Sequence, residues 1–194
     1  TDVPVYYLPR KNMIFGKWAK TGWWPDYLPR FFQKGSVDWP PRLHAAPIIK
    51  GAAQYLEAKE EYAILHNNYT SIEEFITRLN RYTSIAAQAG TEDEVPMLRA
   101  GYEEFVRRYY EQAGYEQGTY GLSLSLLQMF YQTMTAMKRW EKNGLREDGQ
   151  AAALEDELDR MYQYLCFWIA DMHIRTTRSP FGQLYWRIRR KLRV

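Results

Sequence analysis

The residues with the clearest chemical potential lie between positions 10 and 30. Asp26 is the only carboxylate in that stretch, which also contains five lysines and arginines. It directly follows Trp23, Trp24 and Pro25. A carboxylate can act as the general base that takes a proton from a hydroxyl group, and tryptophan faces commonly stack on sugar rings. The pattern suits a site for an anionic, sugar-bearing ligand, while the spacing alone leaves open that Asp26 only caps a turn after the proline.

Three histidines and one cysteine are the other candidates for chemistry. His44 could ligate a metal or contact a phosphate, although lone histidines are more often hydrogen-bonded structural groups. His66 ends an expected strand just before a helix, and orienting that junction is its favoured interpretation. His173 and Cys166 fall within an apolar helical pattern, which favours a structural role for the cysteine and a structural or exposed position for the histidine. The sequence shows no Gly-rich phosphate loop, zinc-spaced Cys/His set or Ser-His-Asp arrangement.

The composition predicts a folded chain. Of the 194 residues, 46% are hydrophobic and 16% are aromatic, which excludes a disordered protein and supplies ample material for a core. The single cysteine cannot form an internal disulfide, so we expect a cytoplasmic location. The first residue is Thr1, and residues 3–8 read as a strand entered midway. We therefore expect the chain to be a piece of a longer protein.

Positive charge is concentrated at the C-terminal end. The formal net charge is +3, yet residues 175–194 hold seven basic residues and no acid. The chain has 26 basic and 23 acidic residues in all, so the part before residue 175 has nineteen basic and twenty-three acidic residues and is net −4. The excess positive charge lies entirely in the tail.

The order of local patterns predicts an α+β fold, with short strands in residues 1–67 followed by a mostly helical region. Strand candidates separated by Pro and Gly are residues 6–8, 27–33, 36–39, 42–48 and 62–66. A short amphipathic helix is predicted for residues 12–20.

The helical part is expected to begin at a capping box formed by Ser71 and Glu74. Helical spacing of apolar residues then predicts three more helices, which begin near residues 96, 122 and 150 and end near residues 114, 142 and 176. Residues 144–149 are the clearest linker.

Residues 118–137 form an uncharged run of twenty residues. That length could cross a bilayer, but several Ser, Thr and Gln side chains make the segment too polar for an ordinary span. A buried central helix is the favoured interpretation. A helix that touches the membrane interface is the alternative.

The tail, residues 181–194, combines apolar and basic residues at helical spacing. Its basic members are Arg187, Arg189, Arg190, Lys191 and Arg193. This composition is typical of a helix that lies on an anionic membrane surface. A solvated terminal helix is the plain alternative, and nucleic-acid binding is disfavoured because no nucleic-acid-binding signature accompanies the charges.

Several motifs, clustered and in order, resemble the second half of family 2 glycosyltransferases. They are YLPRKN at 7–12, FGKW at 15–18 and GWWPD at 22–26, then Arg30-Phe31-Phe32, Lys34-Gly35, Trp39 and His44, then ILHNNY at 64–69 with Ser71-Ile72 and NRYT at 80–83. The resemblance covers about residues 5–140. It is strongest to bacterial inverting enzymes related to lipopolysaccharide-core glucosyltransferases.

The resemblance implies a GT-A type fold and an inverting transfer of sugar from a nucleotide-sugar to a hydroxyl acceptor in cell-envelope glycan or glycolipid synthesis. An acid that matches Asp26 acts as the base in such families. Trp23, Trp24, Arg30 and Lys17 would bind the acceptor or substrate; His44, and with it Arg30, matches positions near the donor phosphates or a divalent metal, Mg or Mn. The enzyme would lie in the cytoplasm, peripheral to the inner face of the plasma membrane.

The sequence departs from that family in two ways. It lacks the nucleotide-binding half with its Asp-x-Asp metal motif, and Ala45 stands where the family often has Glu after the histidine. The resemblance thus implies an acceptor half at residues 1–69, a helical extension at 70–176 and a basic tail at 177–194. We expect little activity from this chain alone, unless another chain supplies the missing half. A non-catalytic module that binds a membrane or a protein is the alternative function.

Overall fold

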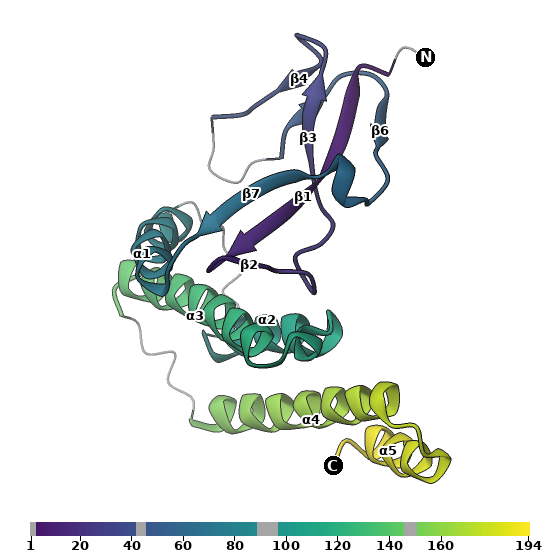
Figure 1. Cartoon of the computed structure of the whole chain (residues 1–194). Coiled ribbons are helices and arrows are strands. Elements are labelled where there is room, and N and C mark those ends of the chain that lie inside the picture. Colours follow the sequence, from purple (N-terminus) through teal and green to yellow (C-terminus); the bar gives the residue numbers. More distant parts are fainter. Residues whose placement is uncertain (1–2, 42–45, 89–96, 146–150) are drawn as a thin grey trace. The chain divides into compact units, whose positions relative to one another are not determined.

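The computed structural model describes residues 3–41, 46–88, 97–145 and 151–194, and Figure 1 draws their helices and strands. The chain divides into two compact units, residues 1–81 and 82–194. The first contains the strands, and the described elements of the second are helices. The expected α+β class, with strands first and helices afterwards, is confirmed.

The first unit is built around one long central strand, β1 (Val5–Ile14). Along one edge, β1 pairs antiparallel with β3 (Asp26–Phe32) and β2 (Lys17–Trp18). Along the other edge it pairs in parallel with β6 (Ala53–Tyr55) and β7 (Ile64–Tyr69). β1 therefore has a strand on both sides over most of its length (Figure 1).

The predicted helix over residues 12–20 is wrong. Residues up to Ile14 belong to β1, and a two-residue turn of Phe15 and Gly16 leads into β2. Both turn residues have positive φ, 52° and 73°, as a tight hairpin of this type requires. The apolar spacing that looked helical is overridden because Asn12, Met13 and Ile14 pair with strands that lie far away in the sequence.

Shorter elements complete the first unit. β4 (Val37–Asp38) and β5 (Ile48–Ile49) form a separate two-stranded sheet, and the 3-10 turn η1 (Glu60–Tyr62) precedes β7. Part of the strand predicted for residues 42–48 lies outside the described residues. The other predicted strands overlap β1, β3, β4 and β7.

At the start of α1 (Ile72–Gln88) the Ser71 half of the predicted capping box forms, while the Glu74 carboxylate bonds Thr70 instead of Ser71. The Ser71 hydroxyl accepts a hydrogen bond from the Glu74 backbone N–H at 3.1 Å, and the Glu74 carboxylate accepts from the Thr70 N–H at 2.8 Å. The Ser71 bond satisfies a backbone donor that the first helical turn would otherwise leave open. The pKa of Glu74 is lowered, first by the hydrogen bond from the Thr70 backbone N–H and then by that from the Thr70 hydroxyl.

In the second unit, α2 (Met97–Val106) packs against α3 (Gly118–Lys142), and two short turns connect them, η2 (Arg107–Glu111) and η3 (Gly114–Gln117). The packing is close, because a Cβ added to Gly101 would lie 2.3 Å from the Thr133 hydroxyl oxygen.

The uncharged run, residues 118–137, forms most of α3 and is only partly buried. Gly121, Leu124, Ser125 and Thr135 are buried, whereas Leu126, Phe130 and Met137 of the same run are exposed. Among the described residues, no helix combines the length and the apolarity that crossing a membrane requires.

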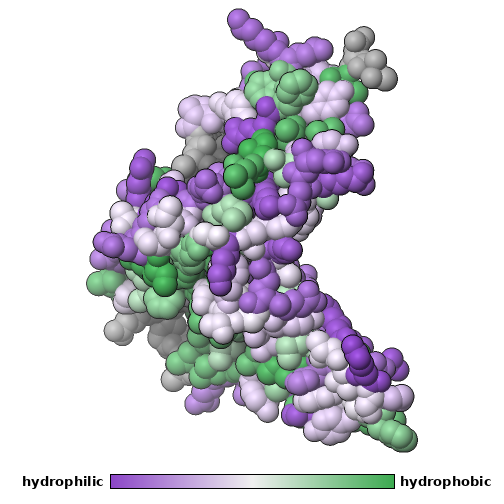
Figure 2. All heavy atoms as spheres, in the orientation of Figure 1, coloured by the Kyte–Doolittle hydropathy of each residue, from purple (hydrophilic) through white to green (hydrophobic). Residues whose placement is uncertain are grey.

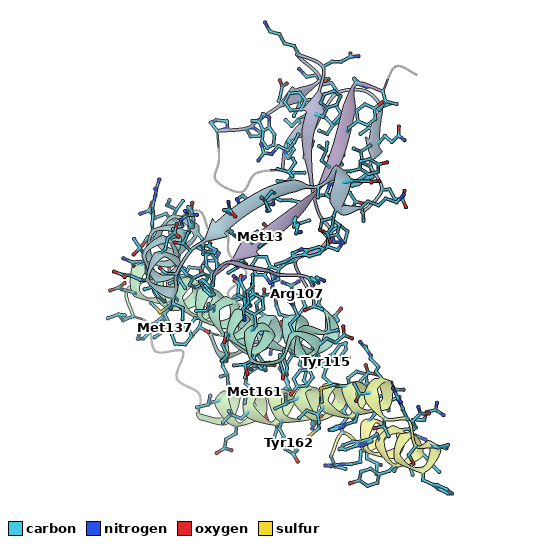
Figure 3. All side chains as sticks on the ribbon, viewed as in Figure 1. Met13, Arg107, Tyr115, Met137, Met161 and Tyr162 are labelled. Atoms are coloured by element: carbon cyan, nitrogen blue, oxygen red, sulfur yellow. The ribbon has the colours of Figure 1, made fainter. Side chains whose placement is uncertain are left out.

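α4 (Ala151–Thr176) and α5 (Pro180–Leu192) form a helical hairpin at the end of the chain. Ser179 caps α5 by accepting a hydrogen bond from the Gly182 N–H, and Pro180 takes the first helical position, where a missing N–H costs nothing. α4 also contacts α2, where Glu157 forms an ion pair with Arg99 and accepts a hydrogen bond from the Tyr102 hydroxyl at 2.9 Å. Figure 3 shows the side chains of these helices.

Candidate functional site

Asp26 opens β3 and lies directly across from Arg10 of β1. The Arg10 Nε donates to Asp26 Oδ2 at 2.8 Å, and Nη2 of the same guanidinium also contacts Oδ2. The two side chains are 26% and 31% exposed, so the pair lies in the surface of the sheet and is accessible to a ligand. Two donors from a single guanidinium hold the carboxylate in a defined position and stabilise its negative charge.

Asn12 is the buried centre of the site. It shares a face of β1 with Arg10 because side chains alternate along a strand, and it is fully buried. Its amide Nδ2 donates to Asp26 Oδ2 at 2.9 Å and to the Trp23 carbonyl at 3.3 Å. Asn12 thus ties the carboxylate to the loop that carries the tryptophans.

His66 of β7 is the fourth member and pairs in register with Asn12. The Nδ2 group of Asn12 is used by two acceptors, so its Oδ1 must be the atom that faces His66 Nδ1, 2.8 Å away. An amide oxygen only accepts hydrogen bonds, and Nδ1 therefore carries the proton. The neutral ring then has its lone pair on Nε2.

The pKa of His66 is lowered from 6.5, first by burial and then by the positive charge of Arg10. Asp26 acts in the opposite direction but does not cancel these effects. Both dominant causes disfavour the imidazolium form. His66 is consequently held as a neutral imidazole at pH values where an exposed histidine would begin to protonate.

The two oxygens of Asp26 have different surroundings. All the hydrogen bonds and ion-pair contacts to this carboxylate from described residues reach Oδ2. Oδ1 receives none from the part of the chain that the structure describes. The carboxylate is therefore anchored through one oxygen while the other can accept a proton or a hydrogen bond from a ligand.

Two tryptophans near this strand pair contact each other. Trp24, joined to Pro25 by a cis peptide bond, packs edge-on against Trp18 of β2 with ring centroids 5.4 Å apart. The ammonium groups of Lys11 and Lys20 lie 4.4 and 4.5 Å from the Trp18 ring centroid. The rings and cations together form a partly exposed aromatic cluster. Lys11 and the partner of Trp18, Met13, alternate with Arg10 and Asn12 along β1, so this cluster lies toward the opposite face of the sheet from the anchored carboxylate.

The other predicted binding residues take separate positions. Arg30 is the extra residue at the bulge of β3, and its guanidinium stacks 5.2 Å from the exposed Trp39 ring. Lys17 is exposed on β2, across from Ile14. His44 lies outside the described residues. Of the predicted set, Asp26 and the backbone carbonyl of Trp23 share the Asn12 amide as donor, and Arg30 is near enough for its charge to lower the pKa of His66.

The predicted tail residues lie on or next to α5. Arg187, Lys191 and Arg193 are exposed, while Arg189 is half-buried. Arg190 has a different environment from the one predicted, because it faces α4 and donates to Asp171 at 2.5 Å.

The divalent metal was expected in the complete enzyme, with His44 as a candidate near it; His44 lies outside the described residues, and the metal stays a prediction. The described side chains include no group of three His, Cys, Asp or Glu residues that could hold an ion. The one carboxylate in the site, Asp26, already has the guanidinium of Arg10 as its counter-ion. We therefore derive no chemical step that passes through a metal.

Sequence reasoning did not assign Arg10 or Asn12 to the site, and it favoured a structural role for His66 at the strand–helix junction. Arg10 and Asn12 have the two-residue spacing of one strand face, which was a usable signal once the strand was recognised to extend to residue 14. The pairing of His66 with Asn12, 54 positions apart, has no local signal.

Comparison with known proteins found no matching family model, no matching curated protein and no matching solved structure.

Proposed function

We propose that this chain is the acceptor side of an inverting, GT-A type glycosyltransferase that transfers a sugar to a hydroxyl acceptor of a cell-envelope glycan or glycolipid. The observation that carries the proposal is the asymmetric anchoring of Asp26, with Oδ2 held by Arg10 and Asn12 and Oδ1 left for a ligand. The family resemblance of residues 5–140 supports the same assignment. The reaction would take place at the cytoplasmic face of the plasma membrane.

In this reaction Asp26 Oδ1 accepts the proton of the acceptor hydroxyl as the hydroxyl oxygen attacks the anomeric carbon. A new C–O bond forms on one face of the sugar, and the bond to the nucleotide diphosphate breaks on the other, which inverts the configuration. The nucleotide-sugar supplies the sugar, and its diphosphate leaves with the bonding electron pair. Arg10 and Asn12 keep the carboxylate aimed through the step, because neither depends on the oxygen that takes the proton.

The remaining residues of the site position the acceptor. Trp24 and Trp18 offer apolar ring surface for a sugar, and Lys11 and Lys20 give that surface positive charge. Because Lys11 and Trp18 lie on the other face of β1 from Arg10 and Asn12, this surface would bind a part of a phosphorylated or acidic glycan away from the hydroxyl at Asp26. His66, held neutral with Nε2 as an acceptor, can receive a hydrogen bond from a second hydroxyl of the same ligand. This arrangement explains why a buried asparagine connects the histidine to the carboxylate.

Replacement of Asp26 by Asn tests the proposal in the complete enzyme, with the donor half supplied in the same chain or as a partner. Asn keeps the shape but cannot take the proton, so the rate of sugar transfer should fall by about 10²–10⁴-fold. The KM for the nucleotide-sugar should stay near the wild-type value. Transfer of labelled sugar to the acceptor measures both.

The matched control is Asp38→Asn, which removes an exposed carboxylate of β4 that pairs with Lys50. It should leave transfer unchanged. Circular dichroism of both variants establishes that they fold. Normal turnover by a folded Asp26→Asn variant would show that Asp26 is not the base.

A further inference from the structure

α5 has one face held firmly against α4. The Trp186 ring stacks on His173 with centroids 4.0 Å apart, and the Arg190 guanidinium donates to Asp171. The Gln183 side chain donates to the Thr177 carbonyl at 2.9 Å. Residues 183, 186 and 190 recur at helical spacing, so they define a single docked face.

The opposite face is an exposed apolar stripe. At about 100° per residue its members fall within an arc of about 100° that is centred opposite the docked face. Each member is more than half exposed, and the first is 85% exposed; they are Phe181, Leu184, Tyr185, Ile188 and Leu192. Hydrophobic side chains lie at the surface beside hydrophilic ones at the end of the molecule where Figure 1 places α5 (Figure 2).

Cations border this stripe on both sides. Arg187 and Lys191 are exposed along one border, and Arg189 lies along the other. From residue 172 to residue 194 the sequence contains no acid. Among the side-chain carboxylates of the described residues, α5 binds Asp171, which lies under the docked face and is shared with Arg175. The exposed face of α5 is therefore apolar along its centre and uniformly positive at its edges.

We propose that this face of α5 is a docking surface for an anionic lipid bilayer. The apolar stripe enters the boundary between headgroups and acyl chains, and the bordering cations remain at the level of the phosphates. A bilayer satisfies both features at once, because it is flat, apolar within and negatively charged at its surface. Nucleic acid would neutralise the cations but would leave five large apolar side chains in water. This property goes beyond the transfer reaction and does not depend on Asp26.

Sedimentation of the whole chain with vesicles tests the proposal. The chain should sediment with vesicles of phosphatidylcholine and phosphatidylglycerol in equal parts, and at least about tenfold more weakly with phosphatidylcholine alone. High salt should weaken binding to the mixed vesicles, because it screens exposed charges. Failure of the chain to sediment with mixed vesicles, or retention on duplex DNA in their place, would overturn the proposal.

Two double variants separate the contributions of the stripe and its borders. Leu184→Ser with Ile188→Ser should weaken vesicle binding about tenfold or more. Arg187→Gln with Lys191→Gln should weaken it about fivefold for each charge removed and should flatten the salt dependence. All four side chains are exposed, so circular dichroism and melting should match the wild type.

The matched control is Leu65→Ser with Ile72→Ser, two equally exposed apolar residues of the first unit. It should bind vesicles as the wild type does. Unchanged binding by the Leu184/Ile188 variant would overturn the proposal. So would a wild-type dimer in sedimentation equilibrium that this variant disrupts without any vesicle binding, because a second copy of the chain would then cover the stripe.

Discussion

Both β1 and α5 carry arginines, but the two elements present them to different surroundings. In β1, Arg10 is paired with Asp26 across the sheet, and buried Asn12 fixes the geometry from below. In α5, Arg187 and Lys191 border an exposed apolar stripe and meet no acid on their own helix. A cation tied to a carboxylate can position that carboxylate for chemistry, whereas a row of exposed cations defines a surface. The residue type alone does not predict whether a basic side chain will position a carboxylate or form part of an exposed positive surface.

The largest effect on stability is expected at the centre of the sheet site. Asn12→Leu removes a buried amide that bonds Asp26, Trp23 and His66. Asp26 keeps Arg10, whereas the Trp23 carbonyl and His66 Nδ1 lose this partner inside a partly buried site. Each such group costs about 1–3 kcal/mol, so the free energy of unfolding should fall by about 2–4 kcal/mol. Urea denaturation followed by circular dichroism measures the change. The control is Asn67→Leu in the exposed part of β7; equal losses in the two variants would show that Asn12 does not organise the site.

A smaller effect is expected at the docked face of α5. Asp171→Asn weakens the ion pairs to Arg175 and Arg190, which are partly exposed, and should cost about 1–2 kcal/mol. Leu184→Ser on the opposite face should change stability by less than about 0.5 kcal/mol. The comparison of melting temperatures checks both. A large loss from Leu184→Ser would mean that this side chain is covered in solution, and the contrast between the two faces of α5 would fail.

The smallest expected effect is a pH dependence of the free energy of unfolding, which arises from His66 in the sheet. Because burial and Arg10 lower the pKa of His66 below 6.5, the unfolded chain binds a proton more readily than the folded chain. The contribution of His66 to stability is therefore complete above pH 6.5 and is lost as the pH falls through the lowered folded-state value. The free energy of unfolding, measured against pH, should show this loss in the wild type and not in His66→Gln. An NMR titration of the imidazole at or above 6.5 would contradict the assignment.

Local features were predictable because their causes are local. The capping box of Ser71 and Glu74 and the spacing of apolar residues located the helices to within a few residues, since caps and helical spacing act over neighbouring turns. The spacing of apolar and basic residues in the tail likewise predicted a helix, and α5 forms there. Asp26 and its tryptophans were identified as a candidate site because they are adjacent in the sequence.

The other features depend on contacts between residues that are far apart in the sequence. Residues 12–20 became strand and hairpin because β1 gains partners from β3 and from β7, and no pattern within those nine residues contains that information. The register of β1, β3 and β7 also brought Arg10, Asn12 and His66 to Asp26. In the tail, docking on α4 turned Arg190 toward Asp171 and left the apolar stripe outside. The sequence by itself determined which side chains were available and where helices begin; the tertiary structure decided which charges are neutralised and which stay exposed, because that depends on partners brought together only by folding.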